Sequence, residues 1–150
     1  MVGGPQILLL FVIVIGSIVL NVFYLLNLQD TMKEVVEARR KVPPVNVWLM
    51  FIPLFNIIYP FILYPNISDS VKAEYEHRGM PAKGDFARGI GIAMPILSLV
   101  SIIPYLGILI AIANLVLFIV FWSKMAEFKN EMRRTPKVDT VGTNGDLLDN

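Results

Sequence analysis

The sequence predicts an all-α integral membrane protein with four transmembrane helices, and three observations support this. Hydrophobic residues make up 55% and charged residues 17% of the 150 residues, whereas soluble domains have roughly 45–50% and about 25%. Lysine and arginine are absent before Lys33 and between Arg88 and Lys124. Long apolar segments occupy residues 7–26, 47–64, 89–103 and 108–122. The chain has too little polar surface to form the shell of a soluble domain.

The first apolar segment, 7–26, has no charged residue. Its length of about 20 residues matches the ~30 Å hydrocarbon core at about 1.5 Å per helical residue. A cleaved signal peptide normally has a basic start and a small-x-small cleavage site. MVGGPQ precedes this segment and Asn-Leu-Gln-Asp follows it, so neither feature is present. We therefore expect a span that is retained.

The second segment, 47–64, belongs to WLMFIPLFNIIYPFILYPN and carries Pro53, Asn56 and Pro60. If it crosses the membrane, the chain makes four crossings, and the positive-inside rule places both termini in the cytoplasm. If Pro53 and Asn56 break it, it re-enters on its own side. All lysines and arginines then share one face, and the N-terminus lies outside. We favour four crossings and keep the re-entrant segment as the alternative.

An internal similarity favours the four-crossing arrangement. FIPLFNIIYPFIL with SVKAEYEHR resembles IIPYLGILIAIAN with SKMAEFKNEM. In the second copy, the turn from Pro104 to Gly107 joins 89–103 and 108–122 into an antiparallel hairpin. By analogy, Pro53 turns the chain in the first copy, so two stacked hairpins are expected. The predicted helix-breaking and turn residues are Pro53, Pro60, Pro104 and Gly107.

Three apolar segments continue into amphipathic extensions on the cytoplasmic side. Their apolar residues follow helical spacing, so we expect the extensions to lie at the lipid headgroups or to pack together beneath the bundle. The alternative left open is that they are solvated helix ends. The stripes are Leu28, Met32 and Val35/Val36; Ile67, Val71 and Tyr75; and Phe121, Met125, Phe128 and Met132. Residues 1–134 form the single helical membrane domain, and the tail 135–150 is expected to be disordered.

Residues 42–132 resemble a family of small bacterial inner-membrane proteins to which no activity is assigned. The resemblance lies in WLMFIPLFNIIYPFIL, ISDSVKAEYEHRG, ARGIGIAMPILSLVSIIP and VFWSKMAEF, and it departs from the family pattern at Pro60 and Pro65. It implies a multi-pass protein of the bacterial inner membrane and brings no mechanism. The interfacial helix that it implies contains Asp69, Ser70, Lys72, Glu74, Tyr75, Arg78 and Gly79.

Three asparagines, Asn21, Asn56 and Asn114, lie within apolar segments. A primary amide is costly in hydrocarbon, so each should face protein or a cavity. Hydrogen bonding between helices is the favoured interpretation, and a polar solute path is the alternative. No Asp, Glu, Lys or Arg lies within a predicted span, which argues against an ion-coupled pump.

The sequence predicts no catalytic site, no metal and no cofactor. Glu74 and His77 form a Glu-x-x-His pair, but carboxylate-bridged metal sites need two such pairs and two further carboxylates. The chain has one histidine and no cysteine. It also lacks a glycine-rich phosphate loop and zinc-ligand spacing.

The expected function is that of a non-enzymatic membrane protein, acting as a homo-oligomer or as an accessory or scaffold subunit of a membrane assembly. The alternative is a passive channel or carrier for a small neutral or lipidic solute. Expected partners are membrane lipids and either further copies of the chain or other membrane proteins. Nucleic acid is not expected, because Arg39-Arg40-Lys41 is short and is offset by Glu34 and Glu37.

Overall fold

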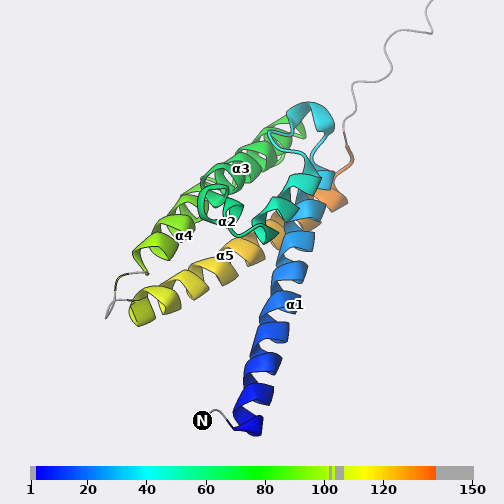
Figure 1. The fold of residues 1–150 in the computed structure, drawn as a ribbon. Helices are drawn as coiled ribbons and strands as arrows, with labels where there is room; N and C mark the ends of the chain where they lie inside the picture. The colour runs from blue at the N-terminus through cyan, green and yellow to red at the C-terminus, as the bar shows by residue number, and fades with distance from the viewer. Residues whose placement is uncertain (1–2, 102, 104–106, 138–150) are drawn as a thin grey trace, which may run out of the picture.

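The computed structural model describes residues 3–101, 103 and 107–137, and within these the fold is all-α, as predicted. Figure 1 shows the arrangement. The elements are α1 (Gly4–Glu34), η1 (Glu37–Arg39), η2 (Pro44–Phe51), α2 (Phe55–Ile58), α3 (Pro60–His77), α4 (Arg88–Val100) and α5 (Gly107–Arg134). The predicted turn residue Pro104 and the tail from residue 138 onward lie outside the described residues. Gly107, also a predicted turn residue, begins α5.

Helices α1, α3 and α5 run in the same direction and meet at their C-terminal ends, which we call the charged end (Figure 1). The Asn27 amide of α1 donates to the Trp122 carbonyl of α5 at 3.4 Å. One turn further along α1, the Thr31 hydroxyl donates to the Met125 carbonyl at 3.2 Å. Helix α4 pairs with α3 and runs in the opposite direction. All 13 lysines and arginines lie in the segments at or near the charged end.

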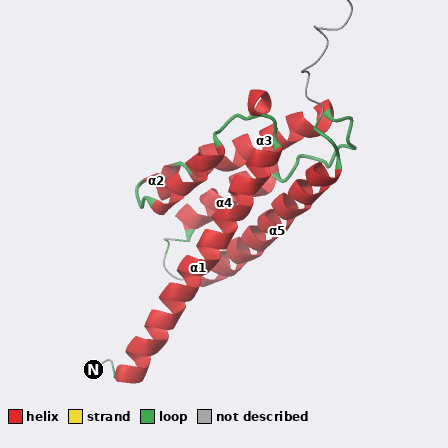
Figure 2. Cartoon of the chain, turned by 90° about the vertical axis from the view of Figure 1, so that its right-hand side faces the viewer, coloured by secondary structure: helices red, strands yellow, loops and turns green. Residues whose placement is uncertain are grey.

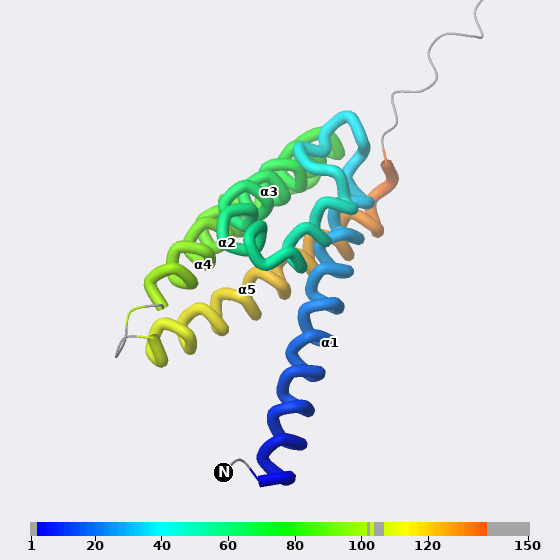
Figure 3. Tube along the Cα trace, in the orientation of Figure 1, coloured from blue at the N-terminus to red at the C-terminus, as the bar shows by residue number. Residues whose placement is uncertain are grey.

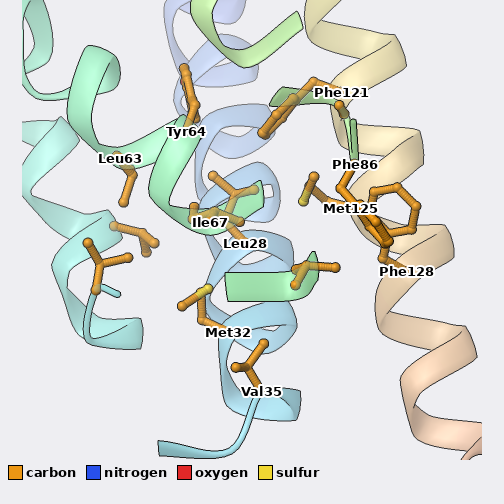
Figure 4. Packing of buried hydrophobic residues seen from close by; sticks show 14 of the residues in the cluster. Leu28, Met32, Val35, Leu63, Tyr64, Ile67, Phe86, Phe121, Met125 and Phe128 are labelled. Atoms are coloured by element: carbon orange, nitrogen blue, oxygen red, sulfur yellow. The ribbon is translucent and has the colours of Figure 1, made fainter. Parts of the chain in front are cut away.

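The hydrophobic core lies near the charged end and is made by the predicted amphipathic extensions. Figure 4 shows their stripes facing one another. The interpretation that these extensions pack together is therefore confirmed. Burying each large apolar side chain contributes about 1.5–3 kcal/mol, so this cluster holds the three helices together. Its buried members include Leu28, Met32, Val35, Ile67, Val71, Tyr75, Phe121, Met125, Phe128 and Met132.

The expected second span, 47–64, is not one helix. The 3₁₀-helix η2 leads away from the charged end beside α1, where the Trp48 indole donates to the Gln29 side chain at 3.2 Å. The chain turns at residues 52–54, and α2 and α3 return to the charged end (Figures 2 and 3). Eight 3₁₀ residues rise only about 16 Å, roughly half of a ~30 Å hydrocarbon core. We call residues 44–58 the returning segment.

Prolines explain the shape of the returning segment, because proline supplies no N–H and fixes its own φ angle. Pro44 begins η2 and Pro53 lies in the turn, as predicted. Pro60 interrupts the helical hydrogen bonds between α2 and α3. However, Tyr59 keeps helical angles (φ −62, ψ −33), so the chain does not change direction there.

Two helices, α1 and α5, are long and apolar enough to cross a membrane, whereas four spans were expected. Helix α4, with 13 residues, is shorter. The apolar windows of α1 and α5 are only 6% and 11% buried. Residues 4–16 of α1 are exposed, and Figure 1 shows that this part of the helix stands away from the other helices. The four-span arrangement is therefore not confirmed.

Gly91 of α4 marks the closest approach of three helices. A Cβ atom there would lie 2.8 Å from Tyr64 Cβ of α3 and 3.1 Å from Phe121 Cε2 of α5. We predict that Gly91→Ala destabilises the protein by about 1–3 kcal/mol through overpacking. Gly16→Ala is the matched control, since nothing lies within 4 Å of its added Cβ and alanine favours helix by about 0.5–1 kcal/mol. Thermal unfolding in detergent should shift in opposite directions for the two variants, and equal shifts would contradict the packing.

Candidate functional site

The apolar part of the fold contains a cavity of about 410 Å³ between α1, the returning segment, α3, α4 and α5. The structure brings Asn21, Asn56 and Asn114 together in its wall, although they come from three separate segments. We call this space the amide cavity. Its lining is Asn21, Tyr24, Met50, Asn56, Ile57, Pro60, Tyr64, Met94, Pro95, Ser98, Leu99, Asn114 and Phe118.

Most of the polar capacity of the amide cavity is not used by the protein itself. The Asn114 amide donates to the Ser98 hydroxyl at 2.8 Å, and Ser98 donates to the Met94 carbonyl at 3.0 Å. The Asn114 carbonyl oxygen is buried and has no partner among the described residues. Within the described part of the chain, the Asn21 and Asn56 side chains make no hydrogen bond. The favoured interpretation, hydrogen bonding between helices, therefore applies to Asn114 and does not extend to the other two.

A second hollow of about 270 Å³ adjoins the amide cavity. Asn21, Met50 and Asn56 line both spaces and form the wall between them. The remaining lining of the second hollow, which we call the apolar hollow, is Ser17, Ile18, Leu25, Phe51 and Pro53. Helix α1 and the returning segment thus border both spaces.

Neither space has a charged residue among its described lining residues. The first charged residue after Asn21 on α1 is Asp30, which lies about 13 Å further along the helix at ~1.5 Å per residue. Helix α5 carries its first charge at Lys124, beyond Asn114 by a similar distance. The two spaces therefore offer hydrogen bonds and apolar contact without a formal charge.

The predicted interfacial helix, which corresponds to the C-terminal part of α3, takes part in a buried ion-pair network at the charged end. The Arg78 guanidinium is fully buried, and its Nε donates to Glu74 at 2.6 Å. It also donates to the carbonyls of Glu34 at 2.6 Å and Met132 at 2.5 Å, which lie in the last turns of α1 and α5. Carbonyls in the last turn of a helix lack partners within the helix and favour a cation. Arg78 therefore joins two helix ends.

Glu74 is the anionic centre of this network. Its second oxygen accepts from Arg39 Nε at 2.7 Å and from the Val36 backbone N–H at 3.0 Å. Burial raises the pKa of the carboxyl, but the hydrogen bonds from Arg39, Val36 and Arg78 outweigh burial and hold the pKa below its ordinary value. Both oxygens of Glu74 thus serve the ion-pair network. No group of three potential metal ligands occurs among the described residues.

The other family-like residues have structural contacts. Asp69 pairs with Lys41 at 2.8 Å and Arg88 at 3.1 Å, and the Ser70 hydroxyl accepts from the Lys41 backbone N–H at 2.9 Å. The Tyr75 hydroxyl donates to Glu131 at 2.8 Å. Lys72 lies near Glu76 at 3.9 Å on the exposed face. Gly79 follows α3 with a φ of +64, which suits glycine.

Sequence reasoning identified the three asparagines but missed their companions in the wall of the amide cavity. Ser98 faces Asn114 across the α4–α5 pair, and a helical hairpin with a known turn could have indicated this pairing. Met50 and Tyr24 belong to ordinary apolar runs, and their sequence positions give no sign of a cavity. Arg39, the partner of Glu74, lies 35 residues away in sequence, so no local pattern connects the two.

Searches against protein families, curated proteins and solved structures find no match to this chain. The resemblance to small bacterial inner-membrane proteins therefore stays a prediction.

We predict that Arg78→Met destabilises the protein by about 3–5 kcal/mol, because it leaves Glu74 charged and buried beside fewer donors. The substitution also removes the Arg78 donors that bind carbonyls at the ends of α1 and α5. Lys72→Met, which removes an exposed residue of the same helix, should change stability by less than about 1 kcal/mol. Thermal or denaturant unfolding in detergent measures both, and similar effects of the two substitutions would contradict the role of Arg78.

We also predict a pH dependence from Glu74. Its folded pKa lies below the ordinary value of 4.5, so its stabilising effect is complete above pH 4.5 and is lost as the pH falls through the folded pKa. The difference in melting temperature between the natural chain and Glu74→Gln should therefore narrow as the pH is lowered below that value. Glu76→Gln, which removes an exposed carboxylate, is the control. A difference that widens in acid would contradict this assignment.

Proposed function

We propose that this chain is a non-enzymatic integral membrane protein that holds a small neutral or lipidic solute in the amide cavity and passes it within, or across, the bilayer. The observation that carries this proposal is the meeting of three amides from separate segments in one uncharged cavity. The geometry favours this function over the accessory subunit that composition alone favoured.

The membrane setting is supported by the exposure of the apolar helices. A hydrophobic core helix of a soluble protein would be mostly buried, whereas the apolar windows of α1 and α5 are 6% and 11% buried. Exposed apolar area on this scale is costly in water. Hydrocarbon around these helices removes the cost, and helices satisfy their own backbone groups there.

We further propose three crossings and a re-entrant segment in place of four spans. In this arrangement α1, α4 and α5 cross, and α4, with 13 residues, does so where the bilayer is locally thinned. The returning segment enters at the charged end, and α3 brings the chain back to it. The C-terminal ends of α1, α3 and α5 then share a single cytoplasmic face that carries the lysines and arginines. The N-terminal end of α1 lies on the opposite side. At the turn of residues 52–54, Pro53 lines the apolar hollow, a setting in which irregular backbone is tolerated at membrane depth.

Cysteine labelling tests this topology, since the natural chain has no cysteine. We expect Glu37→Cys and Ala82→Cys, both at exposed positions, to react with an impermeant maleimide from the same side of the membrane. Gly3→Cys should react from the opposite side. Labelling of positions 37 and 82 from opposite sides would overturn the re-entrant arrangement and support four crossings.

The cavity is well suited to a solute because unused amides are costly in hydrocarbon. Its volume of about 410 Å³ falls within the ~300–1,000 Å³ of typical ligand sites. A bound neutral solute would satisfy the Asn21 and Asn56 amides together, since both are exposed and line the cavity. Each hydrogen bond between the solute and the cavity wall contributes about 0.5–1.5 kcal/mol to binding, so several are needed for useful affinity.

We predict that Asn56→Leu and Asn114→Leu each reduce solute uptake at least several-fold, because each removes hydrogen-bonding groups from the cavity wall. Proteoliposomes with radiolabelled glycerol or monooleoylglycerol provide the measurement. Asn130→Leu, an exposed position near the C-terminal end of α5, is the matched control and should leave uptake unchanged. If both cavity variants fold normally and take up solute at the natural rate, the proposal fails.

A second candidate, an accessory or scaffold subunit or a homo-oligomer, is favoured by one observation. Residues 4–16 of α1 are exposed and stand away from the other described helices (Figure 1). In a bilayer this part of α1 can meet lipid or another protein. Native mass measurement in lipid nanodiscs tests the candidate, and a strictly monomeric protein that co-purifies alone from gently solubilised membranes would count against it.

A further inference from the structure

The two adjoining spaces differ in chemistry, and this difference identifies a class of ligand. We infer that the site takes an uncharged glyceride-like lipid, with its hydroxyl head group in the amide cavity and its acyl chain in the apolar hollow. The inference rests on the proposed function and deepens it by naming the substrate class.

The amide cavity matches a head group that both donates and accepts hydrogen bonds. The Asn21 and Asn56 side chains each present an NH₂ donor and a carbonyl acceptor. The Asn114 NH₂ group is already directed to Ser98 and its oxygen is buried, so the head group would bind mainly to Asn21 and Asn56. Neighbouring hydroxyls on one glycerol unit can act as donors and acceptors at the same time, so they satisfy these groups without adding charge.

The apolar hollow matches an acyl chain. Ile18, Leu25, Phe51 and Pro53 are half of its eight lining residues, and the shared Met50 is also apolar. The shared Asn21 and Asn56 lie at its boundary with the amide cavity. A ligand whose polar and apolar parts are covalently joined can therefore fill both spaces at once. Ile18 and Phe51 are exposed, so the chain can continue from the hollow into the surrounding lipid.

Charge excludes the commoner membrane lipids from this site. A phosphate or carboxylate group withdrawn from water needs a cation or several donors. No lysine or arginine lines either space within the described chain. Phospholipids and fatty acids would therefore leave an unpaired anion. A free polyol such as glycerol avoids this cost but makes no use of the apolar hollow.

A competition experiment tests the inference on the full-length protein in nanodiscs. The probe is a monoacylglycerol with a photoreactive diazirine near the middle of its acyl chain. We expect crosslinks to α1 around Ile18 and Leu25, and competition by monooleoylglycerol. Glycerol, oleate and phosphatidic acid should compete at least about tenfold less well.

Two variants test separately the binding of the head group in the amide cavity and of the acyl chain in the apolar hollow. Asn56→Leu should weaken competition by monooleoylglycerol about tenfold. Ile18→Trp should fill the apolar hollow and reduce crosslinking. Because the Ile18 side chain is already exposed, this substitution should preserve folding. Ile7→Trp, at an exposed position further along the same helix, is the matched control and should bind as the natural chain does.

The outcomes distinguish this inference from the proposed function. If glycerol competes as well as monooleoylglycerol and Ile18→Trp has no effect, the lipid assignment is overturned while the solute site stands. If oleate or phosphatidic acid competes equally, the requirement for an uncharged ligand is wrong. If crosslinking is unaffected by Asn56→Leu and no tested compound competes, both the inference and the proposed function fail.

Discussion

The buried Arg78 guanidinium is the interaction on which the arrangement of the helices depends. It binds Glu74 on its own helix and carbonyls in the last turns of α1 and α5 on its neighbours. A single side chain thus supplies donors to two helix ends, where carbonyls lack partners within the helix. Arg40 adds to this by donating to the Met32 and Val35 carbonyls at 2.9 Å. The helices are fixed at the charged end and are free to diverge away from it.

That divergence leaves room for the returning segment and for the spaces beside it. The core near the charged end consists of well-packed aromatic, leucine and methionine side chains, whereas the part beyond it is wedge-shaped and only partly filled. Gly91 lets α4 approach α3 and α5 closely, which closes one side of the wedge. The returning segment enters the other side and places Asn56 in the same cavity wall as Asn21 and Asn114. The location of the polar cavity therefore follows from where the helices are held together and where they are not.

Periodicity predicted much of this fold, because a stripe of apolar residues every three or four positions specifies a buried helical face. The stripes from Leu28 to Val35 and from Phe121 to Met132 are buried in the core, which was one of the alternatives that the sequence left open. The path of residues 47–64 could not be obtained in this way. A helix that crosses the membrane and a segment that turns back within it have the same hydropathy. What distinguishes the two paths here is that Pro53 lies in the turn directly after η2. The asparagines were recognisable from their unusual setting, but their convergence depends on tertiary packing that no local pattern encodes.

The unsupported part of α1 has a mechanical consequence if the chain lies in a bilayer as proposed. Residues 4–16 stand clear of the other described helices, so the tilt of this part is set by the thickness of the surrounding lipid, at a cost of fractions of a kcal/mol per Å. Ile18 and Asn21 lie between this exposed part of α1 and the part that packs against the other helices. A thinner or thicker membrane would therefore change the width of the amide cavity and of the apolar hollow without disturbing the hydrophobic core.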